Sequence, residues 1–109
     1  MHKDEIPPGT LYLLILKALA RHGELHGYEI RNWIEQVSTE VLQVEEGLLY
    51  PALQRMLIKG WVTAKWGVTA GNRRARYYRL TPLGRKQLEV EVSQFERVMQ
   101  AITRAIQTA

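Results

Sequence analysis

An apolar stripe near the end of the chain constrains the possible folds most strongly. Its members are separated by four, three, four, three and four residues: Leu88, Val92, Phe95, Met99, Ile102 and Ile106. A mean spacing of 3.5 residues keeps the stripe on one side of a helix, which favours packing against another helix. A helix of about 25 residues would be roughly 38 Å long. The stripe therefore predicts a C-terminal dimerisation helix over 81–109 after a separate domain over 1–80; packing on the parent domain alone is the alternative.

The segment Leu11–Ala20 is a second apolar stretch. It is shorter than the roughly 20 residues of a membrane span, and Lys17 interrupts it. We interpret it as a buried helix capped by Thr10. Most of its apolar residues follow the helical period, but Leu13 and Leu16 are apolar on the other side. A helix that is apolar all round needs cover on both faces, and we expect a second subunit to provide it.

Two further helices are predicted between residues 26 and 60. Residues 26–38 carry apolar side chains at three- and four-residue spacing, and residues 47–60 do the same. Pro51 is expected in the first turn of the third helix, where its missing N–H is tolerated. The inner face of this helix is predicted to hold Leu49, Leu53, Met56 and Leu57. Its outward face then holds Gly47, Leu48, Pro51, Gln54, Arg55 and Ile58, with Tyr50 at the boundary.

Two strand-like segments follow the third helix. WVTAKWGV (61–68) and RARYYRL (74–80) flank a turn, which predicts a hairpin with its tip at Thr69–Arg73. Thr81 and the proline after it begin the last helix. Three helices, a two-stranded hairpin and a final helix make a mainly α (α+β) winged helix-turn-helix. In that architecture the third helix enters the DNA major groove, and the hairpin, or wing, lies along the phosphates or the adjacent minor groove.

The charges of the chain are segregated. Residues 47–88 contain no acid and nine of the 15 basic residues, which leaves six bases against all 11 acids elsewhere. A segment of charge +9 against a remainder of −5 indicates an anionic partner, here double-stranded DNA. A winged helix used only for protein interaction is the alternative function, but such a surface has no need to exclude every carboxylate. Membrane binding is disfavoured because the bases lie on a hairpin.

No residue pattern indicates an enzyme. The chain has no cysteine, which excludes thiolate metal sites and fits a cytoplasmic protein. His22 and His26 are four apart, but Gly23 breaks the helix between them. There is no Ser/His/Asp arrangement and no phosphate-binding glycine loop. We therefore expect no catalytic residues, no metal and no cofactor.

With these elements identified, the chain closely resembles the PadR family of bacterial transcriptional regulators. The matching segments, in order, are GTLYLLILKAL, GELHGYEI, VEEGLLYPALQRM, KGWVTAKWG and NRRARYYRLTPLGRKQL. The single C-terminal helix resembles the compact subfamily, and VLQVEEG with NRRARYYRLT resembles the branch abundant in Acidobacteria. The resemblance implies a dimeric winged-helix DNA-binding protein, usually a repressor. In some members a small aromatic or drug-like effector binds at the dimer interface.

The resemblance also assigns residues. The family's tyrosine–proline pair corresponds to Tyr50 and Pro51, of which the tyrosine typically contacts DNA, and its basic wing residues correspond to Arg73, Arg74 and Arg76. Many members have Ser, Thr or Ala where this chain has Leu48. Leu48 could contact a thymine methyl, cover the partner chain or change the operator sequence.

The side chains on the two DNA-facing elements suit different tasks. Gln54 and Arg55 can each make two hydrogen bonds to one base, so they are the candidates for base reading; phosphate contact is the alternative. Lys65 and the wing arginines are expected to contact phosphates or the minor groove. One of Tyr77 and Tyr78 should be core and the other face DNA. Core positions are also expected for Trp33, Trp61 and Trp66.

A homodimer would place two third helices on a pseudo-palindromic operator, with half-sites about 34–36 Å apart or a multiple of that distance. The contact between the two C-terminal helices is called the seam. Repacking of this seam would change the spacing of the half-sites that the dimer can reach and so release DNA. A small aromatic effector could bind between the long helices. The residues expected to line that site are Phe95, Met99, Leu13 and Leu16; a plain interface is the alternative.

Overall fold

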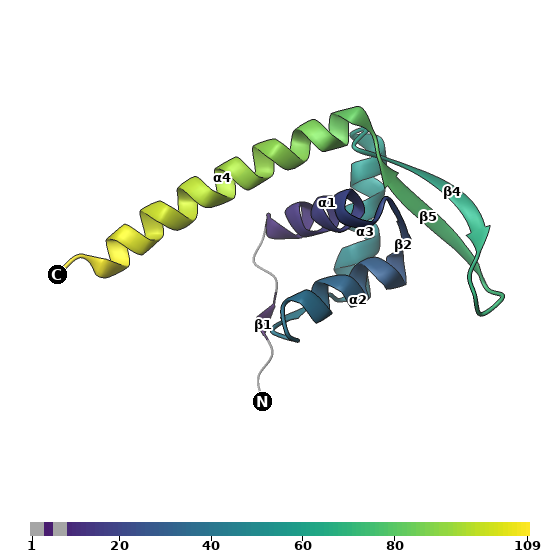
Figure 1. The fold of residues 1–109 in the computed structure, drawn as a ribbon, viewed down its shortest axis with the longest axis horizontal. Helices are drawn as coiled ribbons and strands as arrows, with labels where there is room; N and C mark the ends of the chain where they lie inside the picture. Colours follow the sequence, from purple (N-terminus) through teal and green to yellow (C-terminus); the bar gives the residue numbers. More distant parts are fainter. Residues whose placement is uncertain (1–3, 6–8) are drawn as a thin grey trace.

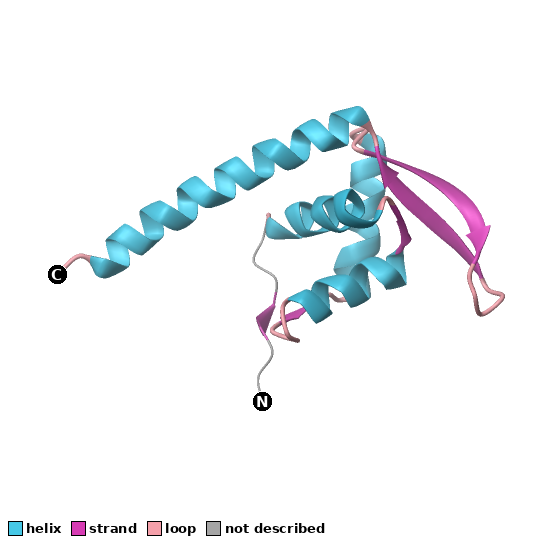
Figure 2. Ribbon diagram, in the orientation of Figure 1, coloured by secondary structure: helices cyan, strands magenta, loops and turns pink. Residues whose placement is uncertain are grey.

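The computed structural model describes residues 4–5 and 9–109. Three helices surround one core, a hairpin projects from one end of it, and the last helix extends away from the body (Figure 1). Helices account for most of the described chain (Figure 2). The elements in order are β1 (Asp4–Glu5), α1 (Thr10–His22), β2 (Glu24–His26), α2 (Gly27–Val37), β3 (Leu42–Gln43), α3 (Glu46–Ile58), β4 (Val62–Val68), β5 (Arg74–Leu80) and α4 (Pro82–Gln107).

The core forms where α1, α2 and α3 bring their apolar faces together. The largest fully buried side chains are Ile15, Leu16, Leu19, Ile30, Ile34, Leu49, Leu53 and Met56. Burying a side chain of this size stabilises the fold by about 1.5–3 kcal/mol. The sheet closes the core with Leu25, Val62 and Tyr78. The inner face predicted for the third helix is confirmed at Leu49, Leu53 and Met56, which are all buried.

The wing has three strands where the sequence predicted two. β2 pairs with β5, and β5 pairs with β4, so the order is β2-β5-β4 with both pairs antiparallel. A strand of three residues is too short for its alternation to be recognised. Leu25 becomes a strand residue because it pairs with Tyr78 on β5, far along the chain. The missed strand joins the wing to the start of α2.

The hairpin tip is confirmed at Thr69–Arg73. Thr69 donates its backbone N–H to the Arg73 carbonyl at 2.8 Å, and its side-chain oxygen accepts the Arg73 N–H at 3.2 Å. Asn72 has a φ of 60°, a left-handed conformation that asparagine tolerates better than most residues.

Two details of the helix starts differ from the prediction. The residue that caps α1 is Gly9, with a φ of 87°, and Thr10 is already helical. Pro51 is the sixth residue of α3, because that helix starts at Glu46, and so lies in the second turn rather than the first. Proline there removes the N–H that would bond to the carbonyl of Gly47.

The start of α4 is as predicted. Thr81 caps the helix by accepting the Gly84 N–H at 3.0 Å, and it donates its hydroxyl to the Gly60 carbonyl at 2.6 Å. α4 then passes along α1, and Leu88 packs against the core. α4 of the same chain therefore covers part of the surface of α1 that was expected to need a second subunit. Leu16 has no exposed surface, so the prediction that it meets a second subunit is wrong.

A small parallel pair joins the beginning of the described chain to the connection between α2 and α3. In β1 and β3, Asp4 pairs with Leu42 and Glu5 with Gln43. None of the helices in the described part of the chain has the length and hydropathy of a membrane span.

Candidate nucleic-acid interface

The outward face of α3 is exposed as predicted. Gly47, Leu48, Tyr50, Pro51, Gln54, Arg55 and Ile58 are all exposed. The buried residues Leu49, Leu53 and Met56 lie on the opposite side of the helix and fix its orientation. A helix with one face buried and the other uncovered can enter a groove of B-form DNA without unfolding.

Tyr50 lies where α3 meets the start of α2. A Cβ atom at position 27 would be 2.9 Å from both Cε1 and the hydroxyl oxygen of Tyr50. Only glycine at this buried position lets the ring pack against the backbone of α2. The ring is therefore supported on one side, and about half of the residue stays exposed. The glycine in the HGYEI segment belongs to the site, a role that the sequence analysis did not assign.

Arg55 lies on the other edge of the outward face, against α1. Its Nε donates a hydrogen bond to the Tyr12 hydroxyl, and its guanidinium carbon is 5.7 Å from the centre of that ring. The ring of Tyr12 in turn packs edge-on against Trp61 at 5.5 Å. The structure thus ties one of the two predicted base-reading side chains to α1, whereas the side chain of Gln54 has no hydrogen-bond partner among residues 9–109.

The strand register separates the wing residues onto two faces, since directly paired residues share a face. Val62 pairs with Leu80, Ala64 with Tyr78, Trp66 with Arg76 and Val68 with Arg74. This face is apolar at the base, where Tyr78 is buried, and cationic toward the tip. The other face carries Lys65 and Tyr77, which form a pair.

The prediction that Trp66 is a core residue is wrong, because 59% of its surface is exposed. The guanidinium carbons of Arg74 and Arg76 lie 4.6 Å and 5.9 Å from the centre of its ring. Trp33 and Trp61 do pack against the core. Tyr78 is the core member of the tyrosine pair, and burial raises the pKa of its hydroxyl, an effect that Arg76 partly opposes and Tyr50 adds to.

Lys65 is separated from the wing arginines. Its Nζ is 3.5 Å from Oε2 of Glu24 on β2, on the face that the arginines Arg74 and Arg76 do not share. Residues 47–88 contain no acid, but the fold brings Glu24 next to Lys65 in this segment. Glu24 belongs to β2, the strand that was not predicted from the sequence. Arg73, Arg74 and Arg76 form no ion pair with any side chain among residues 9–109.

A groove of about 760 Å³ lies between the wing and the helices. His26 and Tyr28 at the start of α2 line the groove, together with Tyr50 of α3. The wing contributes Trp66 and the arginines at 73, 74 and 76. The structure therefore brings together the predicted residues Tyr50, Arg73, Arg74 and Arg76, while Pro51, Gln54, Arg55 and Lys65 lie outside the groove.

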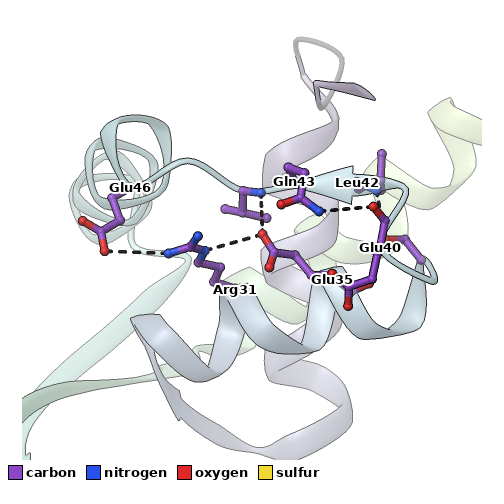
Figure 3. Close-up of polar contacts among 8 residues, drawn as sticks. Arg31, Glu35, Glu40, Leu42, Gln43 and Glu46 are labelled. Atoms are coloured by element: carbon purple, nitrogen blue, oxygen red, sulfur yellow. Dashed lines mark hydrogen bonds and ion pairs between the residues drawn. The ribbon is translucent and has the colours of Figure 1, made fainter. Parts of the chain in front are cut away.

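A polar network fixes the connection between α2 and α3 (Figure 3). Oε2 of Glu35 accepts the backbone N–H of Val44 at 3.0 Å and a hydrogen bond from Nε of Arg31 at 3.5 Å. Nη1 of Arg31 is 3.8 Å from Oε1 of Glu46, the first residue of α3. Oγ of Ser38 accepts a further hydrogen bond from the Leu42 N–H at 3.1 Å. Arg31 and Glu35 are four residues apart on one helix, and this spacing is the sequence signal from which their contact could have been predicted.

His26 organises the start of α2. Its Nδ1 accepts the Glu29 N–H at 3.4 Å, and Oε1 of Glu29 accepts the His26 N–H at 3.0 Å. The two residues form a capping box. No group of three or more His, Cys, Asp or Glu side chains suited to a metal occurs in the described chain.

The stripe on α4 is only partly covered by its own chain. Leu88 and Val92 are half-buried, whereas Phe95, Met99, Ile102 and Ile106 are exposed. A small groove of about 220 Å³ between α1 and α4 is lined by Leu13 and Phe95. Of the four residues expected to line an effector site, these two lie together. Leu16 is in the core and Met99 does not line the groove.

Comparison with known proteins gives consistent matches. A model of the transcriptional regulator PadR-like family matches residues 15–90. A transcriptional regulator from Clostridium thermocellum is 29% identical, with a TM-score of 0.80 over 88% of this chain and 92% of that one. A PadR-like transcriptional regulator from Bacillus cereus is 25% identical, with a TM-score of 0.77 over 93% and 95% of the two chains. PadR of Bacillus subtilis, solved in complex with operator DNA, is 26% identical, with a TM-score of 0.67 over 79% and 48%.

Proposed function

Because the chain belongs to the PadR-like family of transcriptional regulators, we propose that it is a cytoplasmic repressor that binds a pseudo-palindromic operator as a homodimer. The observation that carries this proposal is the groove in which Tyr50 of α3 adjoins a wing with three arginines that have no acidic partner among residues 9–109. The Bacillus subtilis relative was solved on operator DNA, which supports the same partner here.

Gln54 is the residue that we propose for reading a base. It is exposed on the outward face of α3, and a glutamine can accept from and donate to one adenine in the major groove. Arg55 is the second choice for base reading, because its side chain would have to leave the Tyr12 hydroxyl before it could make a bidentate contact to guanine. Tyr50 and Pro51, at the beginning of the same face, are proposed to contact the DNA backbone.

The wing arginines are proposed to bind phosphates. Each contact of this kind releases counterions, so it adds affinity for every sequence and makes binding salt-dependent. Lys65 contributes less, since Glu24 already neutralises it.

The α4 stripe is proposed to form the dimer interface, which comprises the half-buried Leu88 and Val92 and the exposed Phe95, Met99, Ile102 and Ile106. An effector that seats between α1 and α4, against Leu13 and Phe95, would shift this seam. Since the seam sets the distance between the two α3 helices, such a shift would release the operator.

Selection from a pool of random duplexes tests the proposal. We expect enriched sequences to be pseudo-palindromic, with half-sites about 34–36 Å apart or a multiple of that distance. Affinity for the enriched duplex should fall roughly tenfold or more between 50 and 200 mM salt. Binding without salt dependence, or no enrichment at low salt, would favour the protein-interaction module instead.

Two variants then test the division of labour. Gln54→Ala should relax the preference at one base pair, at a cost of about 1–3 kcal/mol on the preferred sequence. The double change Arg73→Ala and Arg74→Ala should weaken binding to all sequences alike and reduce the salt dependence. The assignment is wrong if the wing variant changes sequence preference while Gln54→Ala leaves it intact.

A further inference from the structure

Trp66 is the largest side chain that the wing leaves uncovered, at 59% exposure. An exposed indole makes no contribution to the core, so its position calls for another explanation. The strand register places it on the same face as Arg74 and Arg76: Trp66 pairs directly with Arg76, and Arg74 pairs with the next residue of that face, Val68.

Both guanidinium groups lie over the indole. The distances from the ring centre are 4.6 Å for Arg74 and 5.9 Å for Arg76, within the range of a cation–π contact. A guanidinium that stacks through its planar face keeps its N–H donors at the edge free for an anion. Among the described residues neither arginine has an acidic partner.

The arrangement differs from that of the other wing base. Lys65 lies on the opposite face and is held by Glu24. The charges on the Trp66 face therefore remain available, and they line the groove beside Tyr50.

We propose that Trp66 is a positioning residue that holds Arg74 and Arg76 over its ring so that they bind the phosphates of duplex DNA. This inference rests on the proposed function. A long arginine side chain loses rotamer freedom when it binds, which opposes association. Stacking on Trp66 removes part of that freedom beforehand.

Trp66→Leu tests the inference, because leucine keeps an apolar side chain in the strand but has no aromatic face. The probe is a mixed-sequence duplex of about 30 base pairs at low salt, since phosphate contacts do not depend on sequence. We expect affinity to fall roughly three- to tenfold. Trp66→Phe, which keeps an aromatic face, should restore most of the affinity.

A double-mutant cycle separates positioning from direct contact. In the background Arg74→Gln with Arg76→Gln, Trp66→Leu should change affinity less than about twofold, because the groups that Trp66 positions are gone. A full three- to tenfold loss in that background would mean that Trp66 touches DNA itself, and would overturn the inference.

Folding is checked by thermal unfolding, and we expect the midpoint of Trp66→Leu to match that of the wild type because the ring is exposed. If leucine disturbs the strand, Trp66→Thr serves as the second variant and must show the same loss of affinity. Wild-type affinity in every Trp66 variant overturns the inference alone. A wild-type protein that binds no duplex at low salt overturns the proposed function together with it.

Discussion

Single glycines decide how closely the elements of this fold approach one another. Gly84, the third residue of α4, is the clearest example: a Cβ atom there would lie 2.0 Å from the Trp61 carbonyl oxygen and 3.3 Å from a methyl carbon of Leu80. Trp61 precedes the wing, and its carbonyl also accepts the Thr81 N–H at 3.1 Å. The backbone of α4 therefore rests directly on the backbone at the base of the wing.

We predict that Gly84→Ala lowers the free energy of unfolding by roughly 2–3 kcal/mol, because the clash is with backbone that cannot turn aside. Urea unfolding followed by circular dichroism measures the change. Gly47→Ala is a matched control, since Gly47 also lies in the first turn of a helix but a Cβ there meets no atom within 4 Å. Alanine should leave stability unchanged or raise it by up to about 1 kcal/mol there. Equal effects of the two changes would contradict the close-packing explanation.

At the scale of elements, the connection between α2 and α3 determines how α3 is held. The chain between the two helices passes through two left-handed residues, Thr39 and Glu40, with φ of 49° and 66°. Glu35 then accepts the Val44 N–H from nine residues away, and only 14% of its side-chain surface is exposed. A single carboxylate thus fixes the end of the connection next to α3 (Figure 3).

Glu35→Ala should lower the free energy of unfolding by about 1–3 kcal/mol, because it leaves the Val44 N–H without its acceptor. It should also weaken operator binding, since α3 is no longer held at one angle. Glu46→Ala is the control: it removes the exposed end of the same network, where an ion pair contributes less than about 1 kcal/mol. Denaturant unfolding and duplex titration of both variants check this. If Glu46→Ala proves the more damaging change, Glu35 does not hold the connection.

For the whole molecule, α4 determines the shape. The chain extends over 57 Å along its longest axis, and the end of α4 lies far from the core (Figure 1). Along this helix Phe95, Met99 and Ile102 remain 41–45% exposed. Side chains of this size in one row gain free energy when a partner covers them, roughly in proportion to the area removed from water.

Phe95→Glu should therefore convert the proposed dimer into monomers, because a carboxylate in the seam would lose its hydration without gaining a partner. Light scattering at several concentrations gives the molecular mass directly. Val90→Glu is the matched control: Val90 is 45% exposed on the same helix but lies off the stripe. We expect this variant to remain dimeric. A Phe95→Glu protein with the mass of a dimer would show that another surface joins the subunits.

The sequence by itself determined the features that depend on neighbouring residues. The helical periods placed α1, α2, α3 and α4, and the inward and outward faces of α3 followed from them. Thr81 and Pro82 marked the start of α4, and the turn residues at 69–73 marked the tip of the wing. Capping, turn formation and amphipathic periodicity act within a few residues, so they can be recognised without knowing the fold.

Only the tertiary structure decided which distant residues meet. β2 exists because β5 lies beside it, and it brings Glu24 to Lys65. Leu16 is fully buried in the core, whereas 59% of the surface of Trp66 is left exposed by the described part of the chain. Arg55 bonds to Tyr12, which is 43 residues earlier. Burial and ion pairing depend on the whole packing arrangement, and no local pattern contains that information.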